Sequence, residues 1–172
     1  LSLDIPGVTH EKIRSGLANY VLDKHRIEEV AVRKGVRWVN DSKATNPHAA
    51  EASLKSFHDV IWIAGGLAKG AEMDSLVERT HSRVKSVLLI GTDRELIAEA
   101  LERHAPEISV LRIDGNSSEE LVDALVRAAD QLAREGDTVL LAPACASMDQ
   151  FVSYAERGNL FTQAVRNLPD EG

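Results

Sequence analysis

The sequence has a single cysteine, Cys145, and no apolar run as long as a membrane span. One cysteine excludes an internal disulfide and is typical of proteins from a reducing compartment. A membrane-spanning helix needs about 18 or more consecutive apolar residues, and residues 1–7 lack the basic and apolar parts of a secretory signal. We therefore expect a cytoplasmic protein that does not bind a membrane.

Excess positive charge is also missing. The 172 residues include 20 Lys and Arg against 27 Asp and Glu, which gives a formal net charge of -7. Binding to nucleic acid without sequence preference depends on a basic surface, so nucleic acid is not an expected partner. A few local cations can still bind a small anionic substrate. The six histidines show no paired ligand spacing, and no metal site is predicted from them.

Several sequence motifs with known chemistry are absent. Nothing matches G-x-x-x-x-G-K-[ST], the loop that cradles phosphates, and no strand is followed by the dinucleotide-binding G-x-G-x-x-G. Ser147 does not lie in a G-x-S-x-G elbow, which argues against a hydrolase triad. Cys145 stands between two alanines just after a predicted buried strand, so we interpret it as a packed thiol and not as a nucleophile.

Short apolar runs alternate with amphipathic segments from residue 46 onward. The apolar runs predict strands at 60–64, 87–90, 108–113 and 138–142, and Trp62 and Trp38 lie in strand patterns typical of a core. Predicted helices begin near Asn46, near Asp74, at Asp93 or Thr92 and at Ser117 or Ser118, and a last one runs from about Gln150 to Asn167, with Ser147 or Asp149 as a candidate cap. The alternation predicts a doubly wound, mainly parallel, Rossmann-like α/β sheet of about six strands with flanking helices.

Residues 1–40 do not follow this alternation. A helix opening at Thr9 or His10 is followed by a β-hairpin over 27–40, with its turn at residues 33–35. We therefore divide the chain into residues 1–40, the trailing edge of an upstream domain and the joint, and residues 41–172, a separate carboxy-terminal domain.

Three polar loops follow predicted strands, at the edge where open α/β sheets bind ligands. They are Asn40–Asn46 (NDSKATN), Gly65–Gly70 (GGLAKG) and Pro143–Asp149 (PACASMD). Taken singly, each has an ordinary explanation. Lysines in such loops are more often solvated than ligand-binding, and an Asp-Ser pair is common in local turns.

Taken together, the loops resemble those of the Mur ligases. NDSKATN at 40–46 resembles the signature of the D-glutamate-adding member, and GGLAK at 65–69 resembles its GGxxK loop. PACASMDQF at 143–151 and RGNLF at 157–161 are similar to its carboxy-terminal motifs, and His25-Arg26 matches the pair before the hairpin. The motifs span nearly the whole chain in the family's order and spacing.

The resemblance implies an ATP-dependent reaction that joins D-glutamate to UDP-N-acetylmuramoyl-L-alanine in peptidoglycan precursor synthesis, by a monomer. It places a central ATPase domain upstream, whose trailing edge would be residues 1–40, and which would hold most of the ATP and Mg²⁺ sites and a carbamylated lysine. Residues 41–172 would be the amino-acid-binding domain. The resemblance assigns D-glutamate binding to Thr45, Lys69, Ser147, Met148 and Tyr154, and nucleotide binding to His25, Arg26, Asp41 and Lys43. Because the chain lacks a P-loop, we expect it to be a fragment without ligase activity.

Two other functions stay open from the sequence. A related ligase that adds L-glutamate, of the folylpolyglutamate synthase type, would share the architecture. A stand-alone nucleotide-binding or interaction domain would share the alternating pattern of strands and helices.

Overall fold

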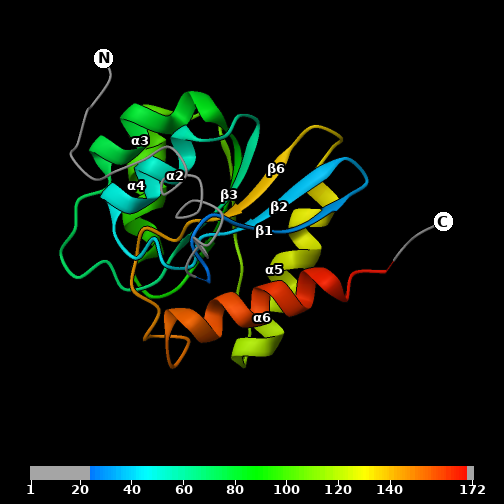
Figure 1. Ribbon diagram of the computed structural model, residues 1–172. Coiled ribbons are helices and arrows are strands. Elements are labelled where there is room, and N and C mark those ends of the chain that lie inside the picture. Colours follow the sequence, from blue (N-terminus) through cyan, green and yellow to red (C-terminus); the bar gives the residue numbers. More distant parts are fainter. Residues whose placement is uncertain (1–23, 170–172) are drawn as a thin grey trace, which may run out of the picture.

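Six strands form one sheet in the order β1-β2-β6-β3-β4-β5 in the computed structural model, which describes residues 24–169 (Figure 1). The helix predicted from Thr9 or His10 lies outside this range. The strands are β1 (Glu28–Arg33), β2 (Val36–Asn40), β3 (Val60–Gly65), β4 (Val84–Ile90), β5 (Ser109–Arg112) and β6 (Thr138–Leu141). The helices are α2 (Pro47–Lys55), α3 (Asp74–Thr80), α4 (Arg94–His104), α5 (Ser118–Leu132) and α6 (Tyr154–Arg166), with a short 3-10 turn η1 (His81–Arg83).

The sheet is parallel from β2 to β5, and only the edge strand β1 runs antiparallel to its neighbour. Helices α2, α3 and α4 cover one face, and α5 and α6 cover the other (Figure 1). Every residue of β3 and β6 is buried, as expected of strands covered on both faces. The predicted doubly wound α/β fold is confirmed.

Each face of the sheet has its own apolar core. Trp62 belongs to the core under α2, α3 and α4, whereas Trp38 packs under α6 with its ring centroid 6.3 Å from that of Phe161. Both tryptophans are almost fully buried, which confirms their prediction as core residues.

The predicted hairpin is present, but it is part of the main sheet. Lys34 and Gly35 at its tip have φ values of 50° and 73°, the left-handed pair that a tight two-residue hairpin turn requires. Strand β2 then pairs in parallel with β6, and α6 packs against both β1 and β2. The hairpin, predicted to belong to the trailing edge of an upstream domain and the joint, thus pairs and packs with β6 and α6 over residues 28–40.

The last helix begins later than predicted. Its N-cap is Ser153, whose side chain accepts a hydrogen bond from the Glu156 N–H, so neither Ser147 nor Asp149 caps it. The carbonyl of Ser147 instead accepts from the next loop residues, and the Asp149 carboxylate accepts from the Thr92 N–H at 2.8 Å. The segment after β6 is therefore a long loop, 142–153, at the carboxyl edge of the sheet.

Side chains predicted as helix caps behave differently along the chain. The side chains of Asn46 and Ser117 each accept a hydrogen bond from the main-chain N–H three residues later and cap α2 and α5, as predicted. Asp74 is the first residue of α3 and bonds Arg103 instead. Asp93 stands at the start of α4, but its carboxylate bonds the Ala68 N–H of a neighbouring loop.

Within residues 24–169, no helix is long and apolar enough to cross a membrane.

Candidate functional site

The three loops singled out from the sequence follow neighbouring strands. Loop 41–46 follows β2, loop 142–153 follows β6 and loop 66–73 follows β3, and these three strands are adjacent in the sheet. Because the strands are parallel, all three loops leave the sheet at the same edge. The sequence gives no sign that the middle loop is the one encoded last.

Main-chain hydrogen bonds join the middle loop to both of its neighbours. The Ala144 N–H donates to the Ala44 carbonyl at 2.9 Å. On the other side, Leu67 and Ala146 exchange two bonds of 2.8 and 2.9 Å, an isolated antiparallel bridge between loops. The predicted D-glutamate residues Thr45, Lys69 and Ser147 lie within two residues of these bonds, so the structure brings their loops together.

Glycines make the close approach of the loops feasible. Gly66 has a φ of 130°, and a Cβ there would lie 2.2 Å from the Ala146 carbonyl oxygen. A Cβ at Gly91 would likewise lie 2.4 Å from the backbone of Gly66. No other residue type fits at either position without displacing backbone. Further along the same loop, Lys69 is exposed and has a left-handed φ of 53°.

The other residues predicted to bind D-glutamate differ in exposure. Ser147 is buried, whereas Thr45 is partly buried. Met148 is 69% exposed and Tyr154 is 37% exposed, and Val152, between them in the sequence, is 83% exposed. Met148 and Val152 are thus exposed apolar side chains of loop 142–153, Tyr154 begins α6, and the sequence pattern did not single out Val152.

The predicted nucleotide residues gather around the start of the hairpin. The His25 carbonyl accepts the Lys43 N–H at 3.1 Å, which ties this segment to loop 41–46. Asp41 is almost buried: one carboxylate oxygen accepts from the Ile27 N–H at 3.2 Å and the other accepts from the Ser53 hydroxyl. Burial raises the pKa of the Asp41 carboxyl above its usual value, although these hydrogen bonds and the charge of Arg26 act in the opposite direction.

Arg157 was part of a motif in the sequence but had no predicted role. Its side chain is 1% exposed and its guanidinium bonds neutral oxygens: the hydroxyl and carbonyl of Ser42, each at 2.9 Å, and the Cys145 carbonyl at 3.4 Å. The signal that could have found it is its helical position, because Phe161 and Val165 follow it at four-residue spacing on the buried face of α6. A charged residue on a core face indicates buried polar partners.

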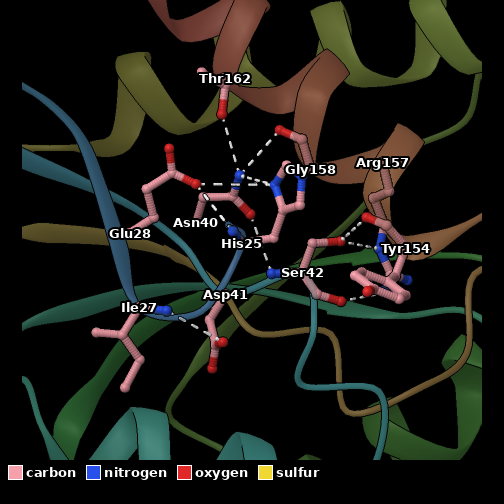
Figure 2. A network of polar contacts seen from close by, with 10 residues as sticks. All are labelled: His25, Ile27, Glu28, Asn40, Asp41, Ser42, Tyr154, Arg157, Gly158 and Thr162. Atoms are coloured by element: carbon pink, nitrogen blue, oxygen red, sulfur yellow. Dashed lines mark hydrogen bonds and ion pairs between the residues drawn. The ribbon is translucent and has the colours of Figure 1, made fainter. Parts of the chain in front are cut away.

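A second network connects the start of the hairpin with α6 (Figure 2). The Asn40 amide nitrogen lies 2.9 Å from His25 Nδ1 and donates to the Gly158 carbonyl at 3.0 Å. Its amide oxygen accepts the Ser42 N–H at 3.1 Å. Burial lowers the pKa of His25. Asn40 and Gly158 were not predicted as site residues, because this contact joins segments more than 100 residues apart.

Cys145 is a buried residue of loop 142–153, and loss of hydration raises the pKa of its thiol to about 12. A thiol with this pKa is not ionised at neutral pH, which confirms the interpretation as a packed residue. Among the residues that the structure describes, no group of three or more His, Cys, Asp and Glu side chains could hold a metal ion.

The arrangement of the loops can be compared with known protein families. The family model described as "Mur ligase, glutamate ligase domain" matches residues 25–145. This chain belongs to the Mur ligase family. The match begins at His25 and so includes the hairpin, in agreement with the sheet order.

Two curated relatives are longer than this Mur ligase chain. The chain is 52% identical over 159 residues to the UDP-N-acetylmuramoylalanine--D-glutamate ligase of Leifsonia xyli, covering 92% of the chain and 31% of that protein. It is 54% identical over 162 residues to the protein of the same name from Streptomyces coelicolor, covering 94% and 34%. The Mur ligase chain thus spans about a third of the length of the relatives it matches.

A solved structure shares the fold. The bifunctional folylpolyglutamate synthase/dihydrofolate synthase of Yersinia pestis aligns with a TM-score of 0.55 and 19% identity, over 94% of this chain and 34% of that one. At this identity, the likeness concerns the fold of the Mur ligase domain alone.

Proposed function

We propose that this chain is the carboxy-terminal, amino-acid-binding part of an ATP-dependent ligase that adds D-glutamate to UDP-N-acetylmuramoyl-L-alanine. The observation that carries the proposal is the meeting of loops 41–46, 66–73 and 142–153 at one edge of the sheet. These loops hold the NDSKATN, GGLAK and PACASMDQF segments. The names of relatives that are 52–54% identical supply the substrate.

In the proposed reaction, ATP transfers its terminal phosphoryl group to the carboxylate of the acceptor, which gives an acyl phosphate and ADP. The amine of D-glutamate attacks the acyl carbon, the new amide bond forms, the amine loses a proton and inorganic phosphate leaves. Binding the amine close to the acyl carbon accounts for much of the rate in such a scheme. The part played by this chain is to bind and orient D-glutamate.

We propose that the two carboxylates of D-glutamate are held by Thr45, Lys69 and Ser147. Lys69 offers a compact positive charge at the tip of a glycine-rich loop, and its exposed position leaves it accessible to a ligand. The buried charge of Arg157 beneath the same loops adds to the attraction for an anion without touching it. Met148 and Tyr154 would cover the apolar part of the amino acid.

We propose that the nucleotide contacts Arg26 and Lys43 as cations, with His25 beside them. Cations near a phosphoryl group offset the charge that develops during transfer. The Asp41 carboxylate holds the Ile27 N–H and Ser53, and each of its oxygens keeps a further lone pair for a ribose hydroxyl. Asp41 would therefore both bind the ribose and fix the segment that carries Arg26.

Other parts of the site would come from outside this chain. No P-loop sequence is present in the 172 residues, and residues 24–169 offer no donor set for a metal ion. We propose that Mg²⁺ and most ATP contacts belong to a central ATPase domain, to which residues ahead of the hairpin lead. The complete protein would act as a cytoplasmic monomer, and the chain alone would release no phosphate from ATP.

The test is phosphate release by the complete protein with ATP, Mg²⁺ and UDP-N-acetylmuramoyl-L-alanine across a panel of D- and L-amino acids. Release that depends on D-glutamate is expected. Lys69→Asn should raise the D-glutamate KM strongly and change the ATP KM little, since Asn tolerates the left-handed backbone but lacks the charge.

A matched control is Lys55→Ala, which removes an exposed lysine at the far end of α2 and should change neither KM. Release that depends on L-glutamate would move the chain to a sister ligase of the same fold. Equal effects of Lys69→Asn on both KM values would contradict its proposed role.

A further inference from the structure

We propose that His25 is a positioning residue for nucleotide binding. Its imidazole fills a slot between Asn40 and Gly158 and thereby fixes the backbone that presents Arg26. The inference deepens the proposed function and rests on it, because it concerns how the nucleotide half of the site is held in place.

The slot is defined by a glycine in the middle of a helix. Gly158 lies in the second turn of α6, where glycine is a poor helix former. A Cβ at this position would lie 2.3 Å from His25 Nδ1, so even an alanine would overlap the ring. The imidazole is correspondingly buried, with His25 only 6% exposed. Glycine at 158 is therefore the condition for the ring to enter.

The hydrogen bonds around the imidazole indicate which of its two nitrogens carries the proton. The Asn40 amide oxygen accepts the Ser42 N–H, so the amide nitrogen is the group that faces His25 Nδ1 and donates to it. Nδ1 is then the acceptor, the ring proton sits on Nε2, and the imidazole is neutral. The two hydrogens of this amide nitrogen are shared among Nδ1, the Gly158 carbonyl and Thr162 Oγ1, which ties α6 to the slot (Figure 2).

Other elements complete the surroundings of the ring. Glu28 of β1 has a carboxylate oxygen 3.9 Å from Nδ1, and the same oxygen accepts the His25 N–H at 3.0 Å. The Tyr154 ring of α6 stands edge-on to the imidazole, with centroids 6.4 Å apart. Lys24, on the same segment, disfavours a charge on the ring. The ring is thus enclosed by β1, β2 and α6.

Enclosing the His25 ring also fixes the backbone of the next residue, Arg26. His25 and Ile27 both have left-handed φ values, 64° and 46°, so Arg26 sits at a sharp corner of the chain. The Lys43 N–H donates to the His25 carbonyl and the Ile27 N–H donates to the Asp41 carboxylate, and these two bonds hold the flanks of the corner. The imidazole is the side-chain anchor of this corner, which leaves the exposed Arg26 in a defined place.

A direct contact between the His25 ring and adenine would need a free face of the ring, whereas Gly158 and the Tyr154 ring pack against the imidazole. The two roles make opposite demands on substitutions. Positioning requires a hydrogen-bond acceptor at Nδ1 and tolerance of left-handed backbone. Stacking on a base requires an aromatic ring.

The experiment measures ATP and D-glutamate KM values for His25→Asn, His25→Gln and His25→Ala in the complete protein. Asn places its amide oxygen where Nδ1 stands and tolerates positive φ, whereas Gln places its amide at the position of Nε2. His25→Asn should stay within about twofold of the wild-type ATP KM, while His25→Gln and His25→Ala raise it roughly tenfold. The D-glutamate KM should move less than twofold in all three.

Two results would overturn the proposal. If His25→Asn raised the ATP KM as much as His25→Ala, the ring itself would be contacting the nucleotide. If all three variants matched the wild type, the slot would have no role in nucleotide binding. A wild-type protein without phosphate release that depends on D-glutamate would instead defeat the proposed function.

The slot can be tested without activity. Gly158→Ala should lower the thermal midpoint of unfolding, and adding His25→Ala should restore part of the loss, because the new methyl group then has room. Absence of that recovery would contradict the geometry of the slot. This measurement separates failure of the slot from failure of the proposed reaction.

Discussion

Arg157 bonds Ser42 twice, through the hydroxyl and the main-chain carbonyl, with both distances at 2.9 Å. The same guanidinium reaches the Cys145 carbonyl of loop 142–153, so one side chain of α6 holds two of the three site loops. Burial lowers its pKa to about 10, which still leaves the group charged at neutral pH. A cation held only by neutral oxygens keeps most of its field available to a nearby anion.

Arg157→Met should destabilise the protein by about 1–3 kcal/mol, because the oxygens of Ser42 and Cys145 lose their donor while remaining buried. Urea denaturation followed by circular dichroism measures the free energy of unfolding. Arg127→Met is the matched control, since Arg127 is exposed on α5, and its effect should stay within about 0.5 kcal/mol. Equal effects of the two substitutions would show that the Arg157 bonds contribute nothing net.

Asp41→Ala should cost about 1–3 kcal/mol, because the Ile27 N–H loses its buried acceptor. Asp41→Asn should be better tolerated, since its amide oxygen can accept from Ile27 and its NH₂ can donate to Ser53 Oγ. The Ser53 hydroxyl can then turn to the Ala49 carbonyl, 3.3 Å away. The same denaturation experiment ranks the two variants, and a reversed order would contradict the hydrogen-bond assignment.

The Asp41→Asn variant also has an expected pH dependence. The pKa of the Asp41 carboxyl is higher in the folded protein than its ordinary value of 3.8, so the unfolded chain ionises first. The contribution of Asp41 to stability is therefore present below this value and is lost as the pH rises through the folded pKa. Relative to the wild type, Asp41→Asn should gain stability as the pH rises above about 4. A difference that stays constant with pH would contradict the raised pKa.

The contribution of His25 to stability should depend on pH with the opposite sign. Its folded pKa lies below the ordinary value of 6.5, so the unfolded state binds more protons as the pH falls past that value. The stabilisation is complete above 6.5 and is lost as the pH falls through the folded pKa. In His25→Asn this loss should be absent, so the stability difference between wild type and variant should shrink on acidification. A difference that grows instead would show that His25 is charged in the fold.

Gly66→Ala should destabilise the protein by about 1–3 kcal/mol more than Gly70→Ala. Both glycines have positive φ, but a Cβ at Gly66 meets the Ala146 carbonyl, whereas one at Gly70 has nothing within 4 Å. The φ of 130° at Gly66 is also less accessible to other residues than the 79° at Gly70. Thermal melts of the two variants give the comparison, and similar midpoints would argue against the tight contact between the loops.

Local patterns were sufficient for most of the fold. Runs such as Val60–Ala64 are apolar because both faces of the strand are covered, and Ser117 precedes α5 with a free side-chain oxygen for its first turn. The start of α6 was misplaced because Ser147, Asp149 and Ser153 are all plausible caps. The structure decides between them: the Ser153 side chain accepts the Glu156 N–H, whereas Asp149 accepts the Thr92 N–H of another loop.

Neighbours in the sheet were not predictable in the same way. The hairpin was separated from the domain because its strands do not alternate with helices, and nothing near residue 40 indicates that β2 pairs with a strand 100 residues later. The supporting residues of the site were also not predictable from local sequence. Loop sequences identified the candidate residues, whereas the buried supports Asn40, Ser53 and Arg157 emerge only when distant segments are brought together.

The position of β6 between β2 and β3 has a consequence for synthesis of the chain. The hairpin and the β3-β4-β5 unit are both complete before Thr138–Leu141 is translated, yet neither unit pairs with the other in the final sheet. Until then each unit exposes an unpaired edge, the kind of surface on which nascent chains associate wrongly. Strand β6 pairs with both β2 and β3 and so joins the two units, and loop 142–153, the middle loop of the site, follows it in the sequence. A chain that stops before residue 138 would therefore hold two separate half-sheets, and residues 138–169 would complete this sheet and the ligand site in a single step.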